Sequence, residues 1–175
     1  VKGFQGHFGM ALRALAFMMS HGADGLKQVA EDAVLSANYV LHHLKSDYDV
    51  PYPGYCMHEC LLTDKNQRAH NITTFDIAKT LIEHGIHPMT TFFPLVVKGA
   101  MLIEPTESES KESIDEFIGV MRHIANEVKA GNTDQFLQNP ISTPRKRLDE
   151  VTAARKPILT WQKLLASDQK DANAA

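Results

Sequence analysis

Residues 91–131, TFFPLVVKGAMLIEPTESESKESIDEFIGVMRHIANEVKAG, contain both kinds of secondary structure around which this chain is organised. Two short apolar runs, 91–97 and 100–103, are separated by a Lys-Gly turn dipeptide, which predicts a β-hairpin. A T-x-x-E pattern beginning at Thr106 predicts a capping box for a long helix that ends at Gly131. The stretch therefore predicts a long helix packed on a small antiparallel sheet.

Upstream of this hairpin, the spacing of apolar residues predicts three further helices and one strand. They are helices over about 8–21, 23–45 and 74–84, the last capped by Thr73 or Thr74, and a strand over 56–62. The first helix is apolar on nearly all sides, with Arg13 as its lone charge. We expect this helix to be buried against a second layer or a partner chain. The complete order of elements predicts an α+β fold with helices on a small, mostly antiparallel sheet.

The pattern divides the chain into three parts. We expect a junction helix in residues 1–22, the α+β domain in 23–138, and a C-terminal arm with a disordered tail in 139–175. The arm carries a basic set with no interleaved aromatic residues, partly neutralised by its acidic neighbours. This set comprises Arg145, Lys146, Arg147, Arg155 and Lys156. Such a set favours a solvated arm or an interface clamp over a nucleic-acid surface.

The composition fits one globular domain. The 175 residues are 43% hydrophobic, and 18 basic against 21 acidic residues give a net charge of -3, so no global positive field attracts nucleic acid or anionic lipid. Two cysteines are too few for a secreted disulfide framework and favour a reducing compartment. Neither a membrane span nor a signal peptide is evident, so we expect a cytosolic location.

Cys56, His58 and Cys60 alternate, so a strand would place all three on one face, and they are zinc-ligand types. However, the two cysteines would lie roughly 13 Å apart along a strand, which is too far for a shared metal or a disulfide. We therefore expect buried thiols and no metal. His58 and His87 are each a candidate acid, base or cofactor neighbour, and a structural histidine is the alternative for each.

Residues 104–112, EPTESESKE, resemble the E-P-T-E-[TS]-E-x-K-E signature of glycine dehydrogenase (decarboxylating), the P-protein of the glycine cleavage system. Four further segments resemble motifs of the same family. They are residues 4–14, the M-H-E motif at 57–59, residues 85–90 against G-F-H-P-P-T, and residues 143–157, which are similar to the closing segment of bacterial subunit 2. So many ordered motifs, over about residues 3–161, are far more specific than any one of them.

The resemblance implies that this chain is the C-terminal small domain of a fold type I pyridoxal-phosphate enzyme. The large domain, with the Schiff-base lysine in an H-K-T setting, is then expected upstream of Val1, and no catalytic residue is expected in this chain. The residues expected closest to the site lie at strand ends and loops within the matching motifs. They are His58, His87, Glu104 and Thr106.

The same resemblance implies an activity and partners. The full enzyme would release CO2 from glycine, with pyridoxal phosphate as electron sink, and pass the aminomethyl group to the lipoyl group of H-protein. Implied partners are subunit 1, lipoylated H-protein and glycine, in an oligomer of the bacterial cytoplasm. The predicted strand 100–103 contains no arginine, so the glycine carboxylate would be held by other groups.

The sequence departs from the family pattern at three positions: His7 replaces Asn, Met89 replaces Pro and Cys60 replaces Phe. An alternative from another class is a non-enzymatic regulatory or oligomerisation α+β module, because the predicted order of elements also describes small ligand-sensing domains. The sequence upstream of Val1 would distinguish the two.

Overall fold

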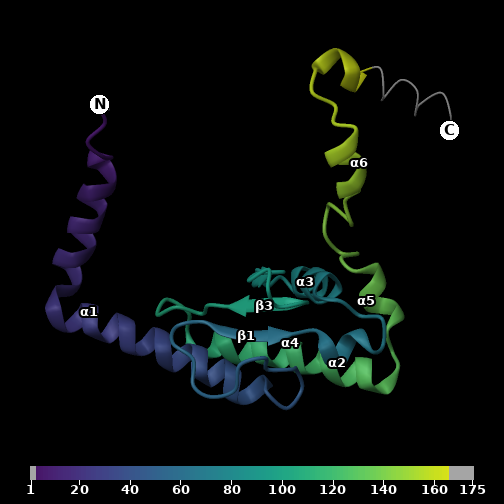
Figure 1. The fold of residues 1–175 in the computed structure, drawn as a ribbon, viewed down its shortest axis with the longest axis horizontal. Coiled ribbons are helices and arrows are strands. Elements are labelled where there is room, and N and C mark those ends of the chain that lie inside the picture. The colour runs from purple at the N-terminus through teal and green to yellow at the C-terminus, as the bar shows by residue number, and fades with distance from the viewer. Residues whose placement is uncertain (1–2, 166–175) are drawn as a thin grey trace.

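Three antiparallel strands form the central sheet, in the order β1-β3-β2 (Figure 1). The computed structural model describes residues 3–165. Strand β3 (Ala100–Ile103) is central and pairs with β1 (Cys60–Thr63) along its whole length and with β2 (Thr90–Thr91) along half of it. The predicted α+β architecture with an antiparallel sheet is confirmed.

One face of this sheet is the floor of the hydrophobic core. The register places Leu62 opposite Met101, and both side chains are fully buried. Leu61 and Leu102 pair on the opposite face and are half-buried. This alternation follows from the two-residue period of a strand and explains why only one face needs a cover of helices.

Helices α1 (Phe8–Leu44) and α4 (Lys111–Ala130) cover the buried face, with α3 (Thr74–Glu83) packed against α4 and β2. The core side of α4 is an apolar stripe at helical spacing. Its fully or nearly fully buried residues are Ile114, Ile118, Met121, Ile124, Ala125 and Val128. Three short helices complete the described chain: α2 (Lys65–Arg68), α5 (Asp134–Gln138) and α6 (Glu150–Arg155).

Local chemistry sets several element ends where the sequence predicts them. Thr73 caps α3 and forms a capping box with Asp76, and the left-handed Gly131 ends α4. Gly22 adopts φ 64° and ψ -172° within α1, so the predicted break between two helices is observed as a sharp kink.

The predicted burial of the first helix is wrong within this chain. The kink at Gly22 directs residues 8–21, which we call the N-terminal arm, away from the domain (Figure 1). As a result Phe8 is 81% exposed and Leu15 is 47% exposed. Cover from a partner remains a prediction.

The predicted capping box at Thr106 is also wrong. Thr106 has φ 62°, whereas an N-cap residue needs an extended backbone, and its hydroxyl accepts a hydrogen bond from the Ser108 amide at 3.2 Å. Helix α4 begins one turn later, where the Ser110 hydroxyl accepts from the Ser113 amide.

Two strands are shorter than predicted. The antiparallel pairing of the hairpin is confirmed, but β2 ends at Thr91 because Phe92 has φ 58° and turns the chain out of the ladder. The strand predicted over 56–62 begins only at Cys60. The predicted disordered tail falls on residues 166–175, outside the described part of the chain.

Candidate functional site

A cleft of about 370 Å³ lies between the loop after α3, the carboxyl end of β3 and helix α4. Its floor is apolar and includes Val40, Ile86, Ile103, Ile114 and Phe117. Its polar side chains are His87, Glu104, Glu109, Ser113 and Glu116. An apolar floor with a few convergent polar groups is typical of a small-molecule site.

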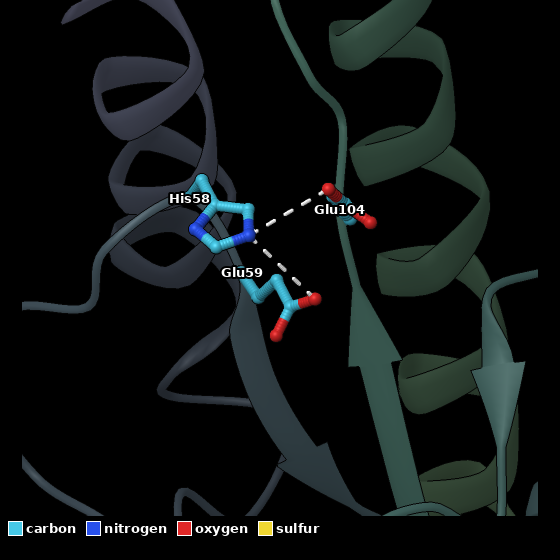
Figure 2. A group of neighbouring side chains, drawn as sticks. All are labelled: His58, Glu59 and Glu104. Carbon is cyan, nitrogen blue, oxygen red and sulfur yellow. Dashed lines mark ion pairs between the residues drawn. The ribbon is translucent and has the colours of Figure 1, made fainter. Parts of the chain in front are cut away.

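His58 lies between two carboxylates beside this cleft (Figure 2). Its Nε2 atom is 3.7 Å from Glu104 Oε1 and 3.8 Å from Glu59 Oε1. The β1-β3 register, which pairs Cys60 with Ile103, brings Glu59 and Glu104 together at adjacent strand ends. Two like charges opposite each other repel, and an imidazole between them relieves this repulsion when it is protonated.

The structure brings three of the four predicted site residues together. Glu104 contacts His58 and also lines the cleft with His87. Thr106 follows Glu104 on the same connection but is not among the residues that line the cleft. Its hydroxyl instead contacts the Ser108 hydroxyl at 2.8 Å and orders the loop before α4.

Sequence reasoning missed the remaining acidic residues of the site. Glu59 belongs to the M-H-E motif, and only the strand register reveals that it faces Glu104. Glu116 and Phe117 follow Ser113 by three and four residues, the spacing that places helical side chains on one face. This spacing in the sequence could have predicted that the three side chains form one wall of the cleft.

Ligand atoms of His58, Glu59 and Glu104 all lie within 4.8 Å of one another, and these side-chain types bind divalent cations. All three are substantially exposed, and residues 3–165 contain no other such group of three. The cysteines are poor candidates, because burial raises the pKa of Cys60 to about 12 and disfavours its thiolate. The expected absence of a metal stays a prediction.

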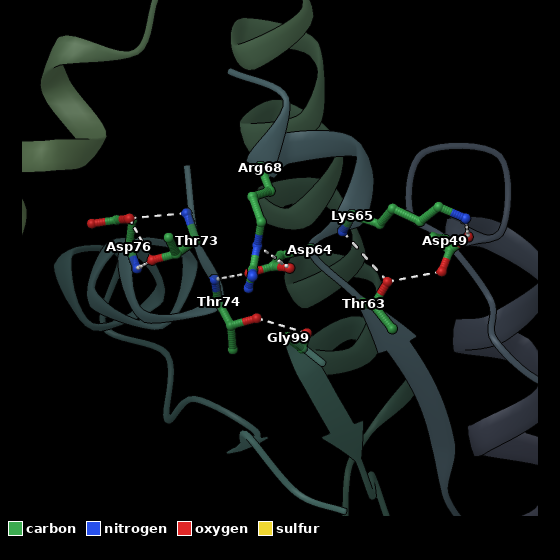
Figure 3. Close-up of polar contacts among 9 residues, drawn as sticks. All are labelled: Asp49, Thr63, Asp64, Lys65, Arg68, Thr73, Thr74, Asp76 and Gly99. Atoms are coloured by element: carbon green, nitrogen blue, oxygen red, sulfur yellow. Dashed lines mark hydrogen bonds and ion pairs between the residues drawn. The ribbon is translucent and has the colours of Figure 1, made fainter. Parts of the chain in front are cut away.

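A second polar network, at the opposite end of β3, holds the sheet to α3 (Figure 3). The buried Asp64 accepts hydrogen bonds from Arg68 Nη2 at 2.7 Å and from the Thr74 amide at 2.8 Å. The Thr74 hydroxyl donates to the Gly99 carbonyl. A Cβ at Gly99 would overlap Asp64 Oδ1, so this network leaves no room for a side chain there. The hydrogen bonds of this network join residues of this chain to one another, which indicates a structural role.

Comparison with solved structures identifies the class of this fold. The structure of the glycine decarboxylase (P-protein) of the glycine cleavage system, in inhibitor-bound form, matches with a TM-score of 0.53 at 19% identity. The match covers 65% of this chain and 25% of the solved chain, and it shows the fold alone.

Sequence comparison then gives the family. Residues 29–143 match the model of the glycine dehydrogenase C-terminal domain. The probable glycine dehydrogenase (decarboxylating) subunit 2 of Caulobacter vibrioides is 52% identical over 168 residues, which are 95% of this chain and 32% of the relative. Its counterpart in Staphylococcus haemolyticus is 49% identical over 164 residues, 94% of this chain and 33% of the relative. This chain belongs to the family of the glycine dehydrogenase C-terminal domain.

Two consequences follow from these matches. The chain spans about a third of the length of the curated relatives it matches. The matches are to glycine dehydrogenase, so they do not favour the alternative of a non-enzymatic regulatory or oligomerisation module. Separately, none of the described helices combines the length and apolar character needed to cross a bilayer.

Proposed function

We propose that this chain forms one wall of the active site of a pyridoxal-phosphate-dependent glycine decarboxylase. The complete enzyme releases CO2 from glycine and transfers the aminomethyl group to the lipoyl group of H-protein. The observation that carries this proposal is the position of Glu104, which lines the cleft together with His87 and lies 3.7 Å from His58 Nε2 beside it; the three residues come from three separate family motifs.

The residues of this cleft do not by themselves fit pyridoxal phosphate. Its charged lining consists of the carboxylates of Glu104, Glu109 and Glu116, which repel a phosphate. Among the described residues that line it there is no lysine for a Schiff base and no arginine for a phosphate or carboxylate. The proposal therefore assigns the cofactor, its lysine and the group that holds the glycine carboxylate to parts of the enzyme outside this chain.

What this chain supplies is a shaped and partly apolar wall. The apolar floor excludes water from one side of the reacting groups, which strengthens electrostatic interactions there. The carboxylates of Glu59 and Glu104 lie 3.8 and 3.7 Å from His58 Nε2. The imidazole of His87 lines the cleft, and an imidazole can accept or donate a proton.

The proposal includes the partners, the substrate and the location of the enzyme. Subunit 1, lipoylated H-protein and glycine are the proposed partners and substrate, within an oligomer of the bacterial cytoplasm. The relatives are named as subunit 2 of a glycine dehydrogenase, which supports a companion subunit 1 as a partner.

Exchange of labelled bicarbonate into glycine tests this proposal in the complete assembly with subunit 1 and H-protein. We expect His87→Ala to lower the exchange rate at least about tenfold, because it removes an acid-base group from the cleft. His84→Ala is the matched control, since His84 is an exposed histidine three residues away that does not line the cleft. Equal exchange rates for both variants would contradict the proposal.

A further inference from the structure

Helices α1 and α4 meet at the cleft, and a hydrogen bond joins them directly beside it. Val40 of α1 and Ile114 of α4 both line the cleft. Their neighbours in the sequence, Tyr39 and Asp115, point away from the cleft lining and contact each other, with the Tyr39 hydroxyl donating to Asp115 Oδ1 at 2.7 Å. The two helices are therefore tied together one residue away from the cleft on each side.

Lys111 contacts both members of this pair. Its ammonium donates to Asp115 Oδ2 and lies 5.3 Å from the centre of the Tyr39 ring. A cation at this distance is attracted by the negative face of an aromatic ring. Lys111 lies in the segment 104–112 that resembles the family signature, yet it does not line the cleft. We call Tyr39, Lys111 and Asp115 the Tyr39 cluster.

The carboxylate of this cluster is held in its charged form. Hydrogen bonds from the Lys111 ammonium, first, and from the Tyr39 hydroxyl keep the pKa of Asp115 below its ordinary value of 3.8. A charged acceptor strengthens the hydrogen bond that it receives. The Lys111 side chain is 67% exposed, so its ion pair contributes little to the stability of the whole fold. The effect of the cluster is therefore expected to be local.

The other polar contacts between α4 and the end of α1 lie farther from the cleft. Arg122 Nη2 donates to the His43 carbonyl at 3.0 Å, and the buried Tyr48 hydroxyl donates to the Met121 carbonyl at 2.9 Å. None of these four residues lines the cleft. Within residues 3–165, no side chain outside the Tyr39 cluster forms a hydrogen bond between α1 and residues 111–118.

We propose that the Tyr39 cluster positions the wall of the cleft that α4 supplies through Ser113, Glu116 and Phe117. The members of the cluster act through this wall, because none of them lines the cleft itself. A shift of about 1 Å in groups that position reactants can lower a rate by about a hundredfold. The inference rests on the proposed function, since the wall affects turnover only if the cleft belongs to the active site.

Amide hydrogen exchange of this chain, followed by NMR, tests the cluster independently of activity. Tyr39→Phe, which removes only the hydroxyl, and Lys111→Met should each raise the exchange rates of amides 114–118 about fivefold, because the first turns of α4 open more often. Lys111→Arg should restore the wild-type rates, since a guanidinium can also pair with a carboxylate and stack on a ring. Arg122→Met is the matched control, because it removes a polar contact between the same two helices away from the cleft.

Exchange of labelled bicarbonate into glycine, in the complete assembly with subunit 1 and H-protein, tests the effect on the site. Tyr39→Phe and Lys111→Met should each lower kcat about fivefold, because the reacting groups are less well oriented. The KM for glycine should stay unchanged, since the proposed function assigns the group that holds its carboxylate to parts outside this chain. Lys111→Arg and Arg122→Met should both retain the wild-type kcat.

Unchanged amide exchange at the start of α4 in Tyr39→Phe and Lys111→Met would overturn the inference, whatever the activities. An equal loss of kcat in Arg122→Met would also overturn it, because it would show general destabilisation. So would faster amide exchange with a normal kcat. In that last case a slow His87→Ala enzyme would confine the failure to the Tyr39 cluster, whereas a normal His87→Ala enzyme would show that the proposed function has failed as well.

Discussion

Leu81 in α3 and Leu15 in the N-terminal arm are both leucines on helices, yet Leu81 is fully buried and Leu15 is 47% exposed. Leu81 belongs to a continuous core formed by α1, α3, α4 and the sheet. Leu15 lies beyond the kink at Gly22, where the described chain offers it no second layer. The comparison shows that apolar periodicity specifies a helix and its need for cover, whereas the location of that cover depends on the rest of the protein.

The core member of this pair gives the largest expected effect. Leu81→Ala should lower the free energy of unfolding by about 2–5 kcal/mol, because it removes buried methyl groups and leaves a cavity. Leu15→Ala in the same chain should change it by less than about 0.5 kcal/mol. Urea unfolding followed by circular dichroism measures both. A Leu15→Ala loss as large as that of Leu81→Ala would show that the arm is packed in this chain after all.

The anchor of the C-terminal arm gives an intermediate effect. Arg147→Met should cost about 1–3 kcal/mol, because Asp76 and two backbone carbonyls lose a charged donor that is only partly exposed. Limited proteolysis should also cut the arm faster near residues 141–150. The exposed Arg145→Met is the matched control and should alter neither stability nor cutting. Unchanged proteolysis of the Arg147 variant would mean that the arm is held by other contacts.

The smallest effect concerns Glu83, whose pKa is held below its ordinary value of 4.5, first by the hydrogen bond from the Ser142 amide. A carboxyl with a lowered folded pKa stabilises the fold above its unfolded pKa, and this contribution is lost as the pH falls through the folded value. The Tm of wild type should therefore exceed that of Glu83→Gln near about pH 6, and the gap should close toward about pH 3. A gap that is constant with pH would contradict this assignment.

The sequence predicted correctly those features that depend on neighbouring residues, and it failed for features that depend on tertiary structure. Local chemistry determines the α3 cap and the Gly131 end of α4: the sequence predicted a cap at Thr73 or Thr74, of which Thr73 is observed, and it predicted the Gly131 end. The conformation of Thr106 depends on how the loop leaves β3, so its T-x-x-E pattern was misleading.

The same distinction applies to the site. The family motifs supplied His58, His87 and Glu104 as separate candidates. The closeness of His58 to Glu104 depends on the β1-β3 register, and the cleft that Glu104 shares with His87 also depends on where α4 lies, neither of which a single motif encodes. For the same reason Glu59, Glu109 and Glu116 became visible as members of the site only in three dimensions.

The central claim is that this chain is one wall of a site whose cofactor lysine lies elsewhere, and borohydride trapping tests it most directly. The chain alone, incubated with pyridoxal phosphate and reduced, is digested and its lysines are quantified by mass spectrometry. We expect no lysine to be labelled stoichiometrically, since none lines the cleft within the described residues. Stoichiometric labelling of one lysine of this chain would contradict the account.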